Sequence, residues 1–83
     1  MKPTAMRKEI VFDGTKMNDF MRGRISGIVY VLMGMPKETW GWFKREASNE
    51  WVWFVECTDD EYLDIVDTIE IAHPGVIIYN ENN

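Results

Sequence analysis

The sequence predicts an α+β domain, a ferredoxin-like sandwich with one mainly antiparallel sheet of four or five strands and two helices on one face. Short runs of β-branched and aromatic residues alternate with two segments of helical periodicity, in the order β-α-β-(β)-β-α-β. The 83 residues suffice for one marginal hydrophobic core, and 46% hydrophobic residues suit a folded chain. We therefore expect one domain over residues 1–83, with residues 1–5 and 80–83 as loose ends.

The first strand is expected over residues 7–13, where apolar residues precede the turn signal Asp13-Gly14. A short helix should follow, because Thr15 is a good N-cap residue. Apolar side chains then recur at the helical spacing i, i+3, i+4. They are Met17, Phe20 and Met21.

The next segment allows two interpretations. Gly23 and Gly27 are expected to weaken and then end the helix. Residues 27–33 are rich in β-branched and aromatic side chains, which predicts a second strand. The alternative is one longer helix over residues 17–33, which the two glycines and the β-branched run disfavour.

Residues 39–45 and 50–56 predict two further strands, joined as a hairpin by the polar residues 47–49. The first of them would alternatively prolong the preceding strand through a bulge at Gly34.

The clearest local signal is the second helix. Thr58-Asp59-Asp60-Glu61 matches a capping box, in which Thr58 and Glu61 each bond the other's backbone amide. The helix should end at His73-Pro74-Gly75, before a last strand over residues 76–79. Five apolar residues form the stripe expected to be buried: Tyr62, Ile65, Val66, Ile69 and Ala72.

The charges are divided unevenly along the chain. The segment from Lys2 to Arg45 contains all nine basic residues and four acids, a net charge of +5, whereas the rest contains ten acids and no base. Nucleic-acid affinity depends largely on Lys and Arg, so the acidic half disfavours nucleic acid as a partner. A negative surface favours a protein partner with a basic surface.

Catalytic, metal and cofactor sites are not expected. One Cys and one His fit no zinc-ligand spacing. Cys57 and His73 are the only conceivable nucleophile–base pair, but they lie at opposite ends of the second helix, about 24 Å apart at 1.5 Å per residue. A single cysteine suits a reducing compartment. With no signal peptide or membrane span in the sequence, we expect a cytoplasmic protein that does not bind membranes.

Four tryptophans cluster in the predicted hairpin, and their use depends on which strand face meets the helices. If Val52 and Phe54 face the helices, the Trp rings lie on the open sheet face, where RNA-recognition domains stack bases. This alternative predicts a single-stranded RNA-binding domain with basic residues nearby. Burial in a small core and a place in a protein interface are other uses of the same rings. The tryptophans are Trp40, Trp42, Trp51 and Trp53, and the basic residues are Lys37, Lys44 and Arg45.

The outer side of the second helix is the main candidate for partner binding. Opposite the buried stripe, acidic side chains lie beside two apolar ones. Acids steer a basic partner toward the surface and apolar side chains hold it there. The alternative is that the apolar residues pack under neighbouring loops and the acids only solvate the helix. The residues are Asp60, Leu63, Asp64, Asp67 and Ile71.

These observations favour a non-enzymatic protein-interaction module, an acidic inhibitor or regulator that docks on a basic, for example nucleic-acid-binding, surface of a target protein. Small inhibitors carried by phages and other mobile elements mimic phosphate charge in this way, an analogy from size and charge alone. A small-molecule-binding or enzymatic α+β domain is a third alternative, which the short chain disfavours because it leaves little room for a deep pocket. An exposed edge strand would also allow a homodimer.

Overall fold

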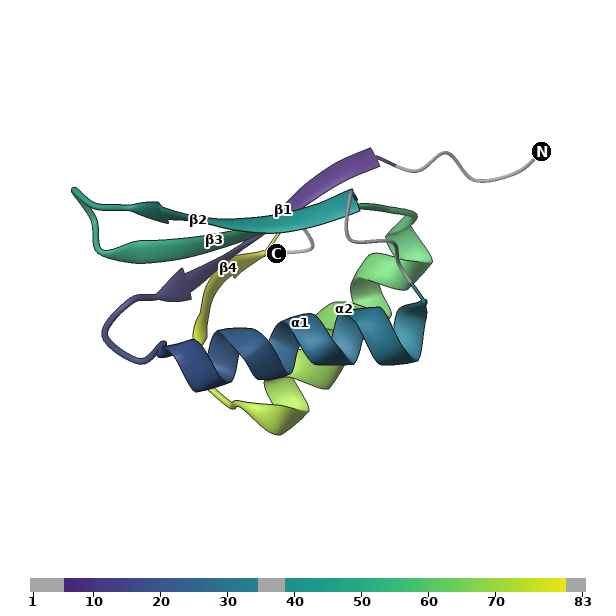
Figure 1. Cartoon of the computed structure of the whole chain (residues 1–83). Coiled ribbons are helices and arrows are strands. Elements are labelled where there is room, and N and C mark those ends of the chain that lie inside the picture. Colours follow the sequence, from purple (N-terminus) through teal and green to yellow (C-terminus); the bar gives the residue numbers. More distant parts are fainter. Residues whose placement is uncertain (1–5, 35–38, 81–83) are drawn as a thin grey trace.

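The computed structural model describes residues 6–34 and 39–80. Of the ends expected to be loose, 1–5 and 80–83, residues 1–5 and 81–83 lie outside the described residues, as does the segment 35–38, whereas Asn80 belongs to the last strand. The elements follow one another as β1 Met6–Asp13, α1 Asp19–Met33, β2 Trp40–Arg45, β3 Glu50–Cys57, α2 Asp59–Ala72 and β4 Ile77–Asn80 (Figure 1).

The strands form one four-stranded sheet in the order β2-β3-β1-β4, with every neighbouring pair antiparallel. Both helices lie on the same face of this sheet (Figure 1). The element order and the strand order are those of a ferredoxin-like sandwich. The predicted α+β class is therefore confirmed.

The predicted strand over residues 27–33 is wrong, and the alternative of one long helix is closer to the structure. α1 continues to Met33 and ends at Gly34, whose φ of 62° is left-handed and suits glycine. The glycines do not interrupt the helix because Ile25 and Val29, one turn apart, are fully buried against the core. Tertiary packing of this stripe outweighs the low helix propensity of the β-branched run.

The start of α1 also differs from the prediction. Asn18 is the N-cap, and its Oδ1 accepts the amide of Met21 at 2.9 Å. Thr15 instead closes the preceding turn, because its amide and hydroxyl both donate to the Asp13 carboxylate, at 2.9 and 2.7 Å. These two hydrogen bonds stabilise the ionised form and lower the pKa of Asp13 below its ordinary value, and nearby Lys16 acts in the same direction.

The capping box of α2 is confirmed. The amide of Glu61 donates to the Thr58 hydroxyl at 3.3 Å, and the amide of Thr58 donates to the Glu61 carboxylate at 2.8 Å. His73 is the C-cap residue, and its amide donates to the carbonyl of Ile69. β4 begins and ends one residue later than expected, so Asn80 belongs to the strand and is buried.

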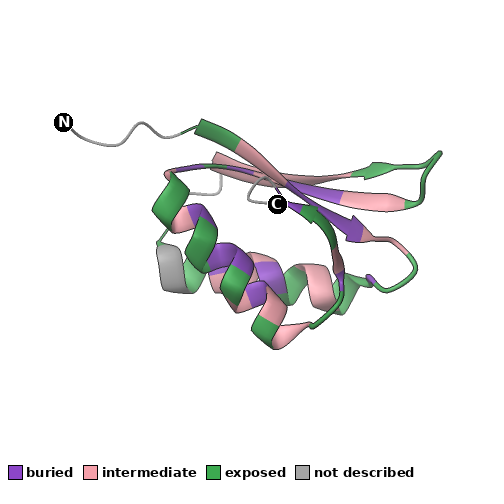
Figure 2. Ribbon diagram, turned by 180° about the vertical axis from the view of Figure 1, so that it is seen from behind, coloured by how far each residue is buried: buried purple, intermediate pink, exposed green. Residues whose placement is uncertain are grey.

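The core fills the space between the sheet and the helices, where Figure 2 shows the buried segments. Tyr62, fully buried on α2, donates its hydroxyl to the carbonyl of Glu9 on β1 at 2.6 Å. This bond ties α2 to the sheet across a sequence separation of 53 residues. The other large, fully buried side chains include Trp53, Phe12, Ile10, Ile25 and Ile65.

The strand faces are the reverse of those required by the RNA-binding alternative. Trp53, Val55 and Cys57 on β3 belong to the core that meets the helices. Val52 and Phe54 alternate with them and therefore lie on the open face. The tryptophans consequently point toward the helices.

Candidate interaction surface

The outer face of α2 is exposed as the helical spacing predicts. Ile71 is 82% exposed and Leu63 45% exposed, so neither packs under a neighbouring loop. The three acids between and beside them, Asp60, Asp64 and Asp67, are exposed as well. All five candidate residues of this helix are thus exposed and lie, by their helical spacing, on the side opposite the buried stripe, which we call the acidic face.

The acids of the acidic face have no ion pair with any described basic residue. Asp59, at the start of the same helix, differs because it pairs with Lys8 at 2.8 Å. Three uncompensated carboxylates within two turns produce a local negative potential that a basic partner would neutralise.

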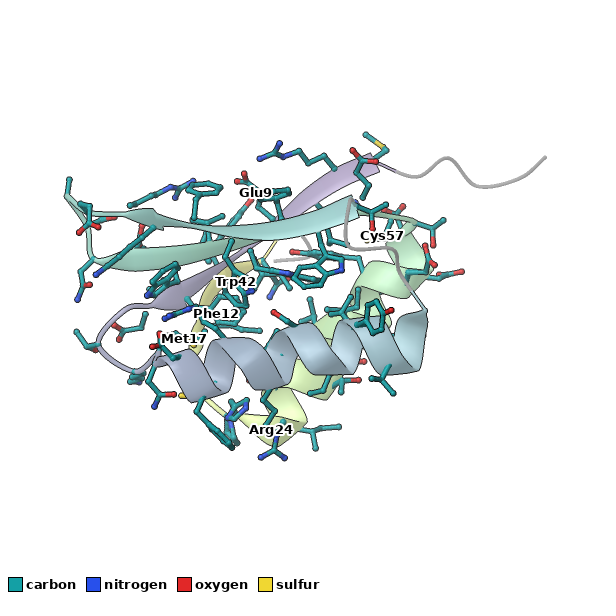
Figure 3. All side chains as sticks on the ribbon, in the orientation of Figure 1. Glu9, Phe12, Met17, Arg24, Trp42 and Cys57 are labelled. Carbon is teal, nitrogen blue, oxygen red and sulfur yellow. The ribbon has the colours of Figure 1, made fainter. Side chains whose placement is uncertain are left out.

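The outer face of α1 is a second exposed surface, which the sequence analysis missed. Phe20 is 73%, Tyr30 59% and Val31 74% exposed. Arg24 is on the same side of the helix by its spacing from Phe20 and Val31. In Figure 3 its side chain lies below α1 and points away from the sheet, which is above the helix. Like the acids of α2, it has no ion pair in the described part of the chain. We call these four residues the α1 outer face.

Both helix glycines, Gly23 and Gly27, lie by helical spacing on the same side of α1 as the α1 outer face. A Cβ at Gly23 or Gly27 would meet no described atom outside the helix's own backbone within 4 Å, so packing among the described residues requires neither glycine. The sequence signal was available: Phe20, Gly27 and Val31 repeat at i, i+7 and i+11, a helical face. It was hidden because the strand prediction divided this helix in two.

The tryptophans, also candidates for partner binding, lie on the side of the sheet that meets the helices. Trp53 is fully buried, while Trp40 and Trp51 are partly buried against the core. Trp42 donates its indole N–H to the Ser26 hydroxyl on α1 at 2.8 Å. Figure 3 shows Trp42 beside Phe12 between the sheet and α1, and their ring centroids are 5.5 Å apart. These rings hold α1 to the sheet.

The open sheet face instead presents Phe43 and Phe54, whose ring centroids are 6.3 Å apart. The guanidinium of Arg7 lies 4.3 Å from the centre of the Phe54 ring, and Arg45 lies 5.9 Å from that of Phe43. The rings are therefore already partly covered by the protein's own cations.

The basic residues proposed as phosphate contacts are also engaged. Arg45 lies 3.7 Å from both Glu9 and Glu50, and Lys44 lies 3.8 Å from Glu46. Lys37 lies outside the described residues. The charges of Arg45 and Lys44 are thus neutralised by neighbouring acids, which does not favour the binding of a polyanion there.

Cys57 and His73 lie just before and just after α2, so the helix separates them. The thiol is 1% exposed and belongs to the core. Across residues 6–34 and 39–80, no three His, Cys, Asp or Glu side chains come together in a way that would hold a metal ion. None of the helices described is long and apolar enough to cross a membrane.

Comparison of the chain with protein-family models, with curated protein sequences and with solved structures found no match.

Proposed function

We propose that this protein is a non-enzymatic interaction module, a regulator or inhibitor that docks through the acidic face of α2 on a basic surface of a target protein. The observation that supports it is the combination on that face of two exposed apolar side chains with three exposed carboxylates that pair with none of the described basic residues. Solvation of a helix requires the charges only, whereas a docking surface uses both kinds of side chain.

The target surface is expected to be basic and to contain apolar positions that receive Leu63 and Ile71. A surface that normally binds nucleic acid fits this description, because it contains clustered Lys and Arg. Docking of the acidic face there would occupy the positions of phosphates and block nucleic-acid binding.

The test is the double reversal Asp64→Lys with Asp67→Lys. Both residues are exposed and pair with no basic residue in the described part of the chain, so the melting curve should stay close to that of the wild type. A control with the same change in net charge, Glu46→Lys with Glu56→Lys, alters two exposed acids outside the acidic face, one in the turn between β2 and β3 and one on β3. Affinity capture from the native host with the three proteins in parallel then identifies targets retained by the wild type and the control and lost by the helix variant.

Binding kinetics with the captured target complete the test. Association with the helix variant should be slower by about tenfold or more at low salt and should depend less on salt, because the charges that steer the encounter have been reversed. The proposal is contradicted if the helix variant associates at the wild-type rate at low salt. It is also contradicted if the control variant associates as slowly as the helix variant. Loss of apolar contact is probed separately with Ile71→Ser, which should accelerate dissociation.

A further inference from the structure

The outer faces of the two helices complement each other. The α1 outer face contains three exposed apolar side chains and the cation Arg24, whereas the acidic face contains two exposed apolar side chains and three acids; none of these charges has an ion pair within residues 6–34 and 39–80. Together they hold five of the eight exposed large hydrophobic side chains in the described part of the chain. Such a concentration of exposed apolar side chains on one side of a small domain marks an interaction surface.

The helix directions limit how a second copy of the chain can cover this side. β1 and β3 are antiparallel, and α1 follows β1 as α2 follows β3, so the two helices run in opposite directions (Figure 1). A two-fold axis parallel to the helices places α1 of one copy against α2 of the other, with the two helices antiparallel. An axis across the helices places α1 on α1 and α2 on α2.

The charges select the first arrangement. With α2 packed on α2, the three acids of one copy would face the same three acids of the other copy. In the α1-on-α2 arrangement, the acids meet the cation Arg24 instead. Arg24 lies two residues before the centre of α1, and Asp67 lies one to two residues after the centre of α2. Antiparallel helices with their centres level therefore place Arg24 opposite Asp67, and Phe20 opposite Ile71.

We propose that two copies of this chain form a symmetric dimer in which the α1 outer face of each covers the acidic face of the other. Gly23 and Gly27 let the opposing helix approach the backbone of α1 closely, since no described side chain lies within 4 Å of where their Cβ atoms would be. The net charge of −5 on each copy opposes association only weakly, because salt screens it beyond about 8 Å at physiological ionic strength.

Such a dimer would regulate the proposed function, and this consequence rests on that function. The acidic face is covered in the dimer, so a basic target binds only after displacing the second copy. Dilution would release the docking surface, and high concentration would mask it. The dimer itself depends only on the two helix faces and is tested without a target.

The experiment is sedimentation equilibrium of the purified chain from about 1 μM to 1 mM, a range that spans common weak and moderate dimers. The wild type should dimerise, and Arg24→Glu should raise the dimer dissociation constant by about tenfold or more. The exchange Arg24→Glu with Asp67→Arg should bring it back toward the wild-type value. Lys16→Glu, with the same change in net charge on an exposed loop residue, should leave it nearly unchanged.

Gly27→Ala separates the interface from the fold. The added methyl group meets no atom of its own chain, so it should raise the melting temperature by improving helix propensity while raising the dissociation constant of the dimer. A wild-type chain that stays monomeric to 1 mM overturns the dimer, as does an Arg24→Glu variant that dimerises as well as Lys16→Glu. Either result leaves target binding by the acidic face standing, because Arg24 is not part of that face.

Discussion

The hydrogen bond between Tyr62 and the carbonyl of Glu9 offers a direct measurement of how α2 is tied to the sheet. Tyr62→Phe removes one oxygen atom from a fully buried side chain and leaves the ring in place, so no large cavity forms. The net contribution of one buried hydrogen bond is about 0.5–1.5 kcal/mol. We therefore expect the free energy of unfolding to fall by about 1 kcal/mol.

Urea denaturation measures this loss. With a slope of about 1 kcal/mol per molar urea for a small domain, the midpoint should fall by about 1 M with the slope unchanged. Tyr30→Phe is the matched control, because it makes the same chemical change in a tyrosine that is 59% exposed on α1. Its midpoint should stay near the wild-type value. Equal shifts in the two variants would show that the Tyr62 hydroxyl is solvated and that α2 is held by apolar packing alone.

Three further expectations concern local structure. Thr58→Ala should lower the unfolding free energy by about 0.5–2 kcal/mol by removing the N-cap of α2, and an unchanged urea midpoint would contradict the capping box. Gly41→Ala should cost about 1–3 kcal/mol through overpacking, because the new Cβ would lie 2.6 Å from Cζ of Phe54; Phe54→Leu in the same chain should recover part of the loss. The lowered pKa of Asp13 contributes stability that is present above the unfolded value of about 3.9 and is lost as the pH falls through the folded value. Melting curves at pH 2–5 should therefore decline less steeply for Asp13→Asn than for the wild type, and parallel profiles would exclude this contribution.

The features predicted correctly are those governed by neighbours in the sequence. The capping box of α2 needs only residues 58–61, and the stripe from Tyr62 to Ile69 follows from helical spacing alone. The β2–β3 hairpin is similarly local, with strands within one residue of the predicted bounds. The exposure of the acidic face follows from the buried stripe, because the opposite side of the same helix must point outward.

Local propensity did not predict the full length of α1. Gly27 and the β-branched run after it favour a strand, but a continuous helix buries Ile25 and Val29 in the core. Once that helix is continuous, the glycines and the exposed residues Phe20 and Val31 fall on one outer face. The α1 outer face therefore became visible only in the tertiary structure.

The sequence by itself thus determined the α+β class, the second helix and its acidic outer face. Only the tertiary structure decided which side of β3 meets the helices. Both sides of that strand are apolar, with Trp53 and Val55 alternating with Val52 and Phe54, so its period of two residues fits either orientation. The core selects the side whose large rings fill the space under α1 and whose neighbour, Trp42, finds a hydrogen-bond acceptor there in Ser26.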